Sequence, residues 1–545
     1  MNKPKFSSAA APVEKPLPLW ILYPLFFTAI YLSHYTLLRL PFFWDEAGYY
    51  IPAALDFYRT GSLIPHSTLS NAHPPLPSLL LASWWRLTGY VISGTRTFIA
   101  MVAAAALVGV FRLARTLAGT PVAVVVTALT AIYPIWFTQS TLAHADIFAA
   151  AFTLWALSFY FGPTLNRNAA AILFSLAALS KETAIVTPVA LALWELTRFL
   201  TKRRRPTYLL ALTSPILPLA AWYAYHRHAT GFIFGNPEFL RYNATANLTP
   251  LRVLLSLWHR VVHLTFHMNF YVPILCTLAV LALPRPGTKP GTPPVEPERW
   301  EGPPLPVLQS DTLKSLAVIV LGNALAFSIL GGALLTRYLL PLYPLILLVC
   351  VALWHQRLPK HWPWLALLTA AAFVAALFFN PPYPFAPEDN LTYRDMIVLH
   401  QQAAQVIESK YPYSTVLTAW PATTELEHPQ LGYVVHPLKV VPLDNFDAEQ
   451  IARAATDPGA YDTALVFSTK WVPTGLNLAG ASESKDTRYF DFHRDLSPAE
   501  VARDLHGDIV WQRTLHGEWA AVLHFPRSNE AHLHSRTNAG APGLD

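Results

Sequence analysis

Long apolar stretches separated by short polar segments dominate the first 380 residues of the chain. A helix needs about 20 mostly apolar residues to cross the hydrocarbon core of a membrane. The pattern therefore predicts about 11 membrane spans, of which Ala169–Ser180 is short enough to be a half-span or a tilted helix. The predicted spans are Leu17–Leu40, Ser93–Ala118, Pro121–Thr138, Leu142–Phe161, Ala169–Ser180, Ala184–Leu200, Tyr208–Tyr225, Leu254–Leu283, Leu313–Leu330, Tyr338–Trp354 and Trp362–Phe379.

Basic residues lie on alternate sides of these spans, and the basic side of a membrane protein is normally cytoplasmic. The segment before the first span contains Lys3, Lys5 and Lys15, so we expect a cytoplasmic N-terminus and a retained first span. An odd number of spans then places the C-terminus outside. The basic residues at predicted inner positions are Arg112, Arg115, Arg167, Lys202, Arg203, Arg204, Arg205, Arg285, Lys289, Arg299, Arg357 and Lys360.

The pattern changes at the proline-rich segment that begins at Pro381, because short strands then alternate with helices. The predicted fold is a polytopic α-helical membrane protein with a C-terminal extracytoplasmic α/β domain. Its predicted divisions are a membrane domain at 1–380 with an outer first loop at 41–92, a soluble domain at 381–530, and a disordered tail at 531–545. The predicted elements of the soluble domain are strands Thr415–Ala419, Val434–Val441, Ala464–Ser468, Ile509–Thr514 and Ala520–Phe525, and helices Tyr393–Ser409, Asp447–Ala455 and Pro498–His506.

Composition and charge agree with this division. Only 13% of the residues are charged and 53% are hydrophobic, which excludes a purely cytosolic enzyme. Residues 1–387 contain 27 Lys and Arg against 12 Asp and Glu, a net charge of +15, whereas the remainder has 12 against 21, a net charge of −9. The two cysteines, Cys276 and Cys350, lie in apolar stretches and exclude a disulfide framework or a thiolate zinc site.

Six of the 12 acidic residues of the apolar region lie in predicted outer loops or at the outer ends of spans. Acidic residues in or beside spans are costly and usually mark function, so the chemistry is expected to face outward. They are Asp45, Glu46, Asp56, Asp146, Glu182 and Glu238.

The outer first loop contains the densest group of these residues. Asp45 and Glu46 follow the first span, and the pattern predicts an interfacial helix over Ala47–Tyr58 and a second one over Leu76–Leu87 that starts behind two prolines. An acidic pair at the end of a span is explained equally well by helix capping and interface solvation.

The motifs FFWDEAGYY and HPPLPS of this loop resemble glycosyltransferase family 39, whose relatives include the protein O-mannosyltransferases and the lipid A aminoarabinose transferases. Arg96, the segment LSKET with Lys181, and the segment TRYLLP with Arg337 resemble the same group in the same order. This sequence departs from these relatives where it has Pro77 and Ser78 in place of Gly-Lys, and His73 and Gly48 in place of basic residues.

The resemblance implies a GT-C fold and a membrane enzyme that transfers a sugar from a polyprenyl-phosphate donor to an acceptor with inversion at the anomeric carbon. It implies Asp45 as the general base, with Glu46 beside it in the catalytic pair. The outer-side cations are candidates for binding the donor phosphate, and three further residues are candidates for binding substrate. The phosphate-binding candidates are Arg96, Lys181, His73 and Arg337, and the substrate-binding candidates are Tyr50, Asp146 and Glu182.

Two of these cations also have a structural explanation. Arg96 fits a snorkelling side chain at a span end, and Lys181 fits a salt bridge with a packed acid. The expected partners are the lipid-linked sugar and membrane lipids, with no nucleic acid, in a bacterial inner membrane. A protein, a lipid and a polysaccharide all remain open as the acceptor.

Three histidines, His259, His263 and His267, recur every four residues and share one face of a helix. Together with His144, the residues His263 and His267 are candidate ligands of a divalent metal ion, although ordinary hydrogen-bonded histidines explain the spacing as well. No other cofactor is expected.

Two other classes of protein fit the apolar pattern. A transporter or lipid flippase normally has two related halves with charges near the bilayer midplane, and no related halves are visible here. A noncatalytic anchor for the C-terminal domain leaves charges such as Asp146 and Lys181 unexplained.

Overall fold

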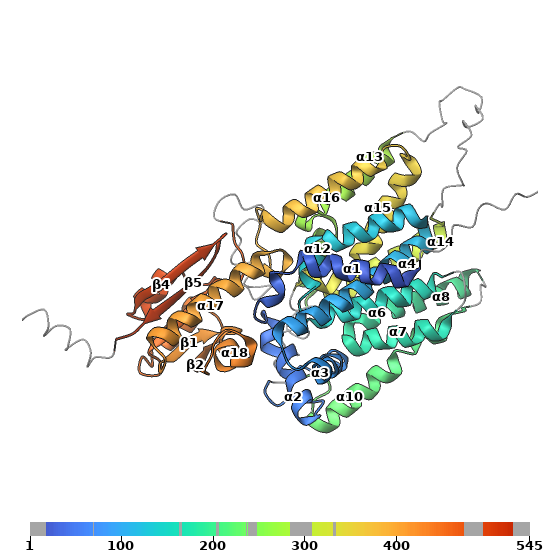
Figure 1. The fold of residues 1–545 in the computed structure, drawn as a ribbon. Coiled ribbons are helices and arrows are strands. Elements are labelled where there is room, and N and C mark those ends of the chain that lie inside the picture. Colours follow the sequence, from blue (N-terminus) through green and yellow to red (C-terminus); the bar gives the residue numbers. More distant parts are fainter. Residues whose placement is uncertain are drawn as a thin grey trace, which may run out of the picture.

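The computed structural model describes residues 18–526 except 69, 163–165, 203–205, 236, 238–247, 284–307, 331–333 and 474–493. The predicted tail at 531–545 and the acidic residue Glu238 lie outside the described residues. The described part forms an elongated molecule in which helices gather in one body and a β-sheet lies beyond one end of it (Figure 1). We call the described residues up to 389 the helical part and those from 392 onward the sheet part.

Three helices of the helical part are long and apolar enough to cross a membrane: α4 (Ile92–Ile132), the continuous helical run Glu182–Lys202 that contains α8 (Val186–Lys202), and α14 (Ser310–Leu330). Five shorter apolar helical stretches also coincide with predicted spans, so the helical nature of these stretches is confirmed while the number of spans stays a prediction. The shorter stretches are Trp20–Ser33 of α1 (Leu19–Ser33), α6 (Ala145–Tyr160), α7 (Arg167–Ser180), α13 (Tyr271–Ala282) and α16 (Trp362–Phe378).

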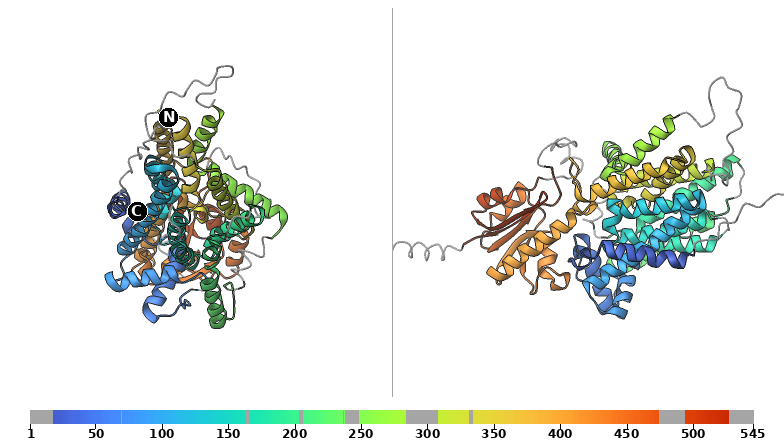
Figure 2. Two further views of the ribbon diagram at one scale, coloured as in Figure 1. Left: turned by 90° about the vertical axis from the view of Figure 1, so that its right-hand side faces the viewer. Right: turned by 45° about the horizontal axis from the view of Figure 1, so that its top comes forward.

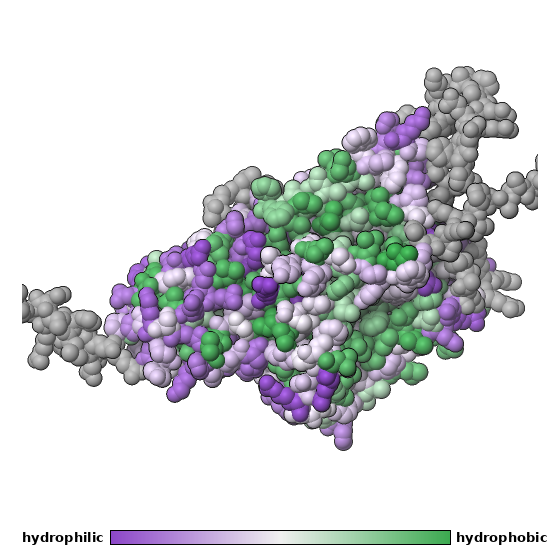
Figure 3. All heavy atoms as spheres, in the orientation of Figure 1, coloured by the Kyte–Doolittle hydropathy of each residue, from purple (hydrophilic) through white to green (hydrophobic). Residues whose placement is uncertain are grey.

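Apolar side chains cover the flank of the helical part, whereas hydrophilic ones predominate on the sheet part (Figure 3). Trp20, Leu210, Leu217 and Leu321 are exposed large apolar side chains on these helices. Exposed apolar surface of this extent on a helical body is typical of contact with lipid. Inside the body, α6 packs against both α4 and α7, and α4 also packs against α1 and α15 (Tyr343–Arg357).

Several predicted spans are interrupted. The single span predicted over Leu254–Leu283 is wrong, because α12 (Pro250–Thr265) and α13 are separated by a turn in which Met268 and Asn269 have positive φ angles. The Asn269 side chain donates to the carbonyl of Ala372, and Tyr383 accepts from the backbone N–H of Met268, so neighbouring segments stabilise the break. Such interruptions inside membrane proteins need partners of this kind for the freed backbone groups.

Two further stretches also differ from the prediction. The stretch predicted over Pro121–Thr138 ends at Ile132 and is followed by α5 (Pro134–Gln139), while α4 bends at Gly119, whose φ is +83°. The stretch predicted over Tyr208–Tyr225 is divided into α9 (Leu209–Thr213) and α10 (Ile216–Thr230).

The first loop, at 41–92, contains both of its predicted helices. After a short helical turn at η1 (Leu37–Arg39), the first begins as a π-helical turn, η2 (Glu46–Tyr50), and continues as α2 (Ile51–Thr60), which ends at Gly61 in the left-handed conformation. The second helix, α3 (Leu76–Thr88), packs against α2. Its start behind Pro74 and Pro75 confirms the predicted proline start.

The sheet part contains five strands in the order β2-β1-β3-β5-β4. The pairs β1–β2 and β1–β3 are parallel, and β3–β5 and β4–β5 are antiparallel. Strand β2 is the one that departs from its prediction, because it begins at Lys439 rather than Val434. The strands are β1 (Thr415–Ala419), β2 (Lys439–Leu443), β3 (Thr463–Phe467), β4 (Asp508–Leu515) and β5 (Glu518–His524), and the helices are α17 (Thr392–Lys410), α18 (Ala422–Glu427), α19 (Ala448–Ala454) and α21 (Pro498–Asp504), with a turn at η8 (Pro429–Leu431).

Helix α17 leads from the helical part to the sheet and packs on β4 and β5 (Figure 2). The sheet part also contacts the outer first loop directly. The Tyr433 hydroxyl donates to the carbonyl of Phe42 at 2.9 Å, and the Trp44 and Trp420 rings meet edge to face with centroids 5.2 Å apart. The first loop is therefore held between the two parts.

Gly48 in η2 lies directly under the indole of Trp420, and a β-carbon at this position would overlap the ring. We expect Gly48→Ala to destabilise the protein by about 1–3 kcal/mol, because the extra methyl group forces the indole out of its place. The apparent melting temperature in detergent should fall. The control is Gly94→Ala in α4, where a β-carbon meets only the side chain of Val91, at 3.7 Å.

The Trp420→Ala background separates this contact from other effects. There, Gly48→Ala should cost almost nothing, because the ring that it displaces is absent. An equal fall in both backgrounds would contradict the contact.

Candidate active site

The Asp45–Glu46 pair of the sequence is divided between two different environments. Glu46 is fully buried and accepts hydrogen bonds from the backbone N–H groups of Phe43 at 2.8 Å and Ala143 at 2.6 Å. Its carboxylate lies 3.1 Å from Arg96 Nη2. Burial raises the pKa of Glu46, while Arg96 and the two backbone donors act in the opposite direction.

Arg96, from the first turns of α4, is also buried and surrounded by acceptors of the chain itself. It donates to the carbonyl oxygens of Leu40 and Thr141 at 2.9 and 3.0 Å and to that of Pro41. Arg96 and Glu46 thus tie the first loop to α4 and to the segment before α6. The structure does not bring Arg96 to either of the pockets described below.

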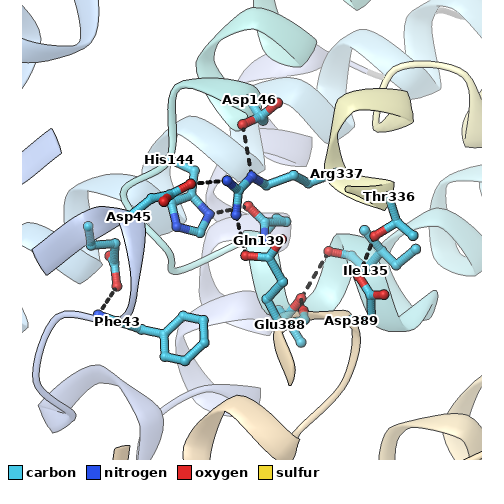
Figure 4. A network of polar contacts seen from close by, with 12 residues as sticks. Phe43, Asp45, Ile135, Gln139, His144, Asp146, Thr336, Arg337, Glu388 and Asp389 are labelled. Atoms are coloured by element: carbon cyan, nitrogen blue, oxygen red, sulfur yellow. Dashed lines mark hydrogen bonds and ion pairs between the residues drawn. The ribbon is translucent and has the colours of Figure 1, made fainter. Parts of the chain in front are cut away.

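Arg337 is the centre of a second cluster, shown in Figure 4. It lies in the short turn η6 (Thr336–Leu339) and forms ion pairs with Asp45 and Glu388. Its Nε lies 3.4 Å from Asp146 Oδ2. One guanidinium group therefore faces three carboxylates, which come from the first loop, from the first turn of α6, and from the turn η7 (Pro387–Asp389) that precedes α17.

Lys181 extends this cluster. Its ammonium group donates to Asp146 Oδ1 at 2.6 Å and lies 3.8 Å from the ring centroid of Tyr338. Arg260 lies 5.9 Å from the same ring centroid. Lys181, Arg337, Asp45 and Asp146, which the sequence predicted from separate segments, are thus brought together.

The three carboxylates around Arg337 differ in accessibility. The side chain of Asp45 is 27% exposed, whereas those of Asp146 and Glu388 are 3% and 4% exposed. Burial and the neighbouring carboxylates of Asp389, Asp45 and Asp146 together raise the pKa of Glu388 to about 8, although Arg337 opposes this. Asp45 is therefore the carboxylate of this cluster that a second substrate can reach.

Glu388 and Asp389 are the residues that the sequence analysis missed. Asp389 accepts from the Thr336 hydroxyl and lies 2.9 Å from His267 Nε2, so both acids of η7 reach back into the helical part. The signal was a consecutive acidic pair directly after the last predicted span, but those residues were assigned to the boundary of the soluble domain.

His73 is paired with Glu182 at 2.9 Å and stacks on Tyr50 with ring centroids 6.0 Å apart. His144 has Gln139 Oε1 2.9 Å from its Nδ1, and its ring centroid lies 6.0 Å from that of Tyr50. These contacts bring three predicted substrate or phosphate ligands, Tyr50, His73 and Glu182, into one group beside the Arg337 cluster.

The predicted metal ligands make other contacts. His267 is engaged by Asp389, and His263 lies next to His267 with ring centroids 5.5 Å apart. Within the described residues, no group of three or more His, Cys, Asp or Glu side chains has an arrangement that could hold a metal ion. In the described residues these histidines contact Asp389, Gln139 and one another.

Two pockets flank the cluster. The first, here called the loop pocket, is lined by residues of η2, α2 and the start of α3, including Tyr49, Tyr50 and His73. The second, here called the helix pocket, is lined by Asp146, Lys181, Arg337 and Tyr338 together with apolar residues of α6 and α14.

Buried polar atoms without a hydrogen-bond partner are rare in folded proteins and call for an explanation. Within the described residues, five of them belong to this cluster or to side chains beside it (Figure 4): Gln139 Nε2, His144 Nε2, Asp146 Oδ2, Arg337 Nε and Glu388 Oε1. The cluster therefore has polar atoms that a bound polar group could engage.

Comparisons with known proteins bear on the family and the fold. Residues 72–223 match the family model described as dolichyl-phosphate-mannose-protein mannosyltransferase. The resemblance to the protein O-mannosyltransferases is confirmed. The matched segment contains Arg96, Asp146 and Lys181. A comparison with curated protein sequences found no significant match.

Two solved structures have a similar fold. ArnT from Cupriavidus metallidurans in the apo state is 13% identical with a TM-score of 0.50, and the match covers 93% of this chain and 98% of that protein. The same protein bound to undecaprenyl phosphate is 13% identical with a TM-score of 0.51, covering 92% and 98%. At this identity the likeness establishes the fold, which spans both the helical part and the sheet part.

Removing Arg96 should unfold the protein rather than weaken donor binding alone. We expect Arg96→Met to destabilise the protein by about 3–5 kcal/mol, because Glu46 is left buried without its cation. Thermal unfolding in detergent measures the loss, with Arg59→Met at an exposed position as the control. A variant that melts like the wild type but fails to bind undecaprenyl phosphate would instead make Arg96 a phosphate ligand.

Stability should fall as the pH rises through about 8. Because the pKa of Glu388 is higher in the folded protein than in the unfolded chain, the folded state holds an extra proton between about pH 4.5 and 8. The stabilisation from this proton is complete below that window and is lost above it. Melting temperatures between pH 6.5 and 9 should decline less for Glu388→Gln than for the wild type, and parallel curves would show that Glu388 is not the group that titrates.

Proposed function

We propose that this chain is an inverting glycosyltransferase that moves a sugar from a polyprenyl-phosphate donor to an acceptor on the outer face of a bacterial inner membrane. The observation that carries the proposal is the placement of Lys181 and Arg337 in an otherwise largely apolar pocket, next to the accessible carboxylate of Asp45. The bound lipid of ArnT, undecaprenyl phosphate, has the chemistry that such a pocket suits.

The helix pocket has the features that a lipid-linked phosphate requires. Lys181 and Arg337 supply positive charge, and Arg337 offers a planar set of donors that suits phosphate oxygens. Ala149, Phe327 and Pro341 add apolar walls. The donor's isoprenoid tail lies in the membrane while its phosphate meets the two cations.

Asp45 acts as the general base in this proposal. The donor phosphate competes with Asp45 for Arg337, and the carboxylate that is displaced accepts the proton of the acceptor hydroxyl. The acceptor oxygen forms a bond to the anomeric carbon, and the bond from that carbon to the phosphate oxygen breaks with its electron pair leaving on the phosphate. A single displacement of this kind inverts the anomeric configuration.

Asp146 and Glu388 position the cations rather than react. Asp146 bridges Lys181 and Arg337, and Glu388 holds Arg337 from the side of the sheet part. Both are nearly inaccessible, so neither can reach an acceptor. The net charge of the cluster is close to balanced when Glu388 is protonated.

Loss of the base should abolish transfer while donor binding survives. We expect Asp45→Asn to lower the rate of sugar transfer by about 10²–10⁴-fold, because the acceptor proton then has no acceptor. The full chain in liposomes is supplied with labelled undecaprenyl-phosphate sugars and its native membranes as the acceptor source. Affinity for undecaprenyl phosphate should change by no more than a few-fold.

The matched control is Asp56→Asn, a carboxylate of the same loop whose Oδ2 accepts from the backbone N–H groups of His66 and Ser67. It should retain transfer if it folds. Full activity of Asp45→Asn would remove Asp45 as the base, and no transfer by the wild type from any lipid-linked sugar would refute the proposed function itself.

A further inference from the structure

The loop pocket is a second binding site next to the Arg337 cluster. It contains about 400 Å³ of empty space, part of it open to solvent. Its walls include Tyr49, Tyr50, Phe57, His73 and Ser78. The pocket lies between α2 and α3, outside the apolar helices that line the helix pocket.

The same two segments of the chain join the loop pocket to the reacting groups. Asp45 immediately precedes the π-helical turn that ends at Tyr50, and residues five apart in such a turn lie on one side of it. The second segment contributes Lys181 to the lining of the helix pocket. The next residue, Glu182, is the ion-pair partner of His73 in the loop pocket. Two short stretches of chain thus connect the loop pocket to Asp45 and to Lys181.

The charges of the two pockets are different. The described lining of the loop pocket includes no Lys or Arg, and its one imidazole, that of His73, is paired with the carboxylate of Glu182. The helix pocket, by contrast, contains Lys181 and Arg337. A phosphorylated molecule would find no unbalanced positive charge in the loop pocket.

Aromatic rings and prolines make up most of the remaining lining of the loop pocket. Tyr49 and Tyr50 meet edge to face with ring centroids 5.5 Å apart, and both rings contact His73. Flat rings of this kind pack against the C–H faces of sugar rings, while the tyrosine hydroxyls and the imidazole are suited to sugar hydroxyl groups.

We propose that the loop pocket binds the acceptor and that this acceptor is an uncharged carbohydrate that presents a hydroxyl group to Asp45. This inference rests on the proposed function. In the reaction, the acceptor hydroxyl transfers its proton to Asp45 and its oxygen becomes the glycosidic oxygen, so the product is a sugar-to-sugar linkage and free polyprenyl phosphate.

The linkage in the product tests the chemical class directly. The full chain is incubated with its native membranes and a labelled undecaprenyl-phosphate sugar, and the labelled product is analysed. We expect a linkage that survives both mild acid and mild alkali and that methylation analysis assigns to a sugar hydroxyl. Release by mild acid would indicate a phosphate acceptor, and release by alkaline β-elimination would indicate a Ser or Thr acceptor; either result overturns the inference while leaving the proposed function intact.

A pair of variants tests the site. Phe57→Ala should lower transfer at limiting acceptor by about tenfold, while affinity for undecaprenyl phosphate stays within twofold and transfer recovers at high acceptor concentration. The neighbouring Tyr58→Ala is the matched control, because Tyr58 packs against Trp85 and Arg86 outside the pocket lining.

Phe57→Leu keeps more of the apolar volume than Phe57→Ala and is less disruptive to folding. It should lower transfer at limiting acceptor to a level between those of the wild type and Phe57→Ala. Equal acceptor dependence in wild type, Phe57→Ala and Phe57→Leu would overturn the assignment of the pocket. Absence of any transfer by the wild type would instead count against the proposed function on which this inference rests.

Discussion

The buried guanidinium of Arg337, shared by three carboxylates, is the interaction on which the site depends. A charge in such a place is tolerated only when it is paired, and Asp45, Asp146 and Glu388 supply more negative charge than one cation balances. Lys181 and a proton on Glu388 bring the cluster close to neutrality. The first loop, α6 and the turn before the sheet part must therefore come together for the charges to be satisfied.

Contacts outside the Arg337 cluster hold these three segments in place. The Glu46–Arg96 pair fixes the start of the first loop against α4, and the Trp420 indole covers Gly48 from the other side. Glu388 and Asp389 anchor the entrance to α17 in the helical part. The sheet part thus contributes to the site through its connection and its packing, even though its own strands contain none of the clustered carboxylates.

Two pockets with different linings lie close to the Arg337 cluster. One is cationic and walled by apolar helices, and the other is aromatic and electrically balanced. In the proposed function these two linings divide the binding of donor and acceptor by charge. The adjacent residues Lys181 and Glu182 connect the two pockets along the chain. The short segment from Asp45 to Tyr50 connects the Arg337 cluster to the loop pocket.

The sequence by itself determined the helical stretches, most strands of the sheet and the residues that cluster in the first loop, because these follow from local hydrophobic periodicity and from short motifs. It indicated Asp45 and Asp146 as functional residues because acidic residues beside apolar helices are costly, and Lys181 and Arg337 through the resemblance of their motifs to glycosyltransferase family 39. Only the tertiary structure decided that Arg96 belongs to Glu46, that His73 belongs to Glu182, and that Glu388 completes the Arg337 cluster. The break in the helix at Met268 and Asn269 could not be predicted from the sequence either, because it is stabilised by the carbonyl of Ala372 and the hydroxyl of Tyr383, which are distant along the chain. Charged side chains and unpaired backbone groups find their partners on segments that come together only in the folded protein. The spacing of residues along the chain does not determine which segments these are.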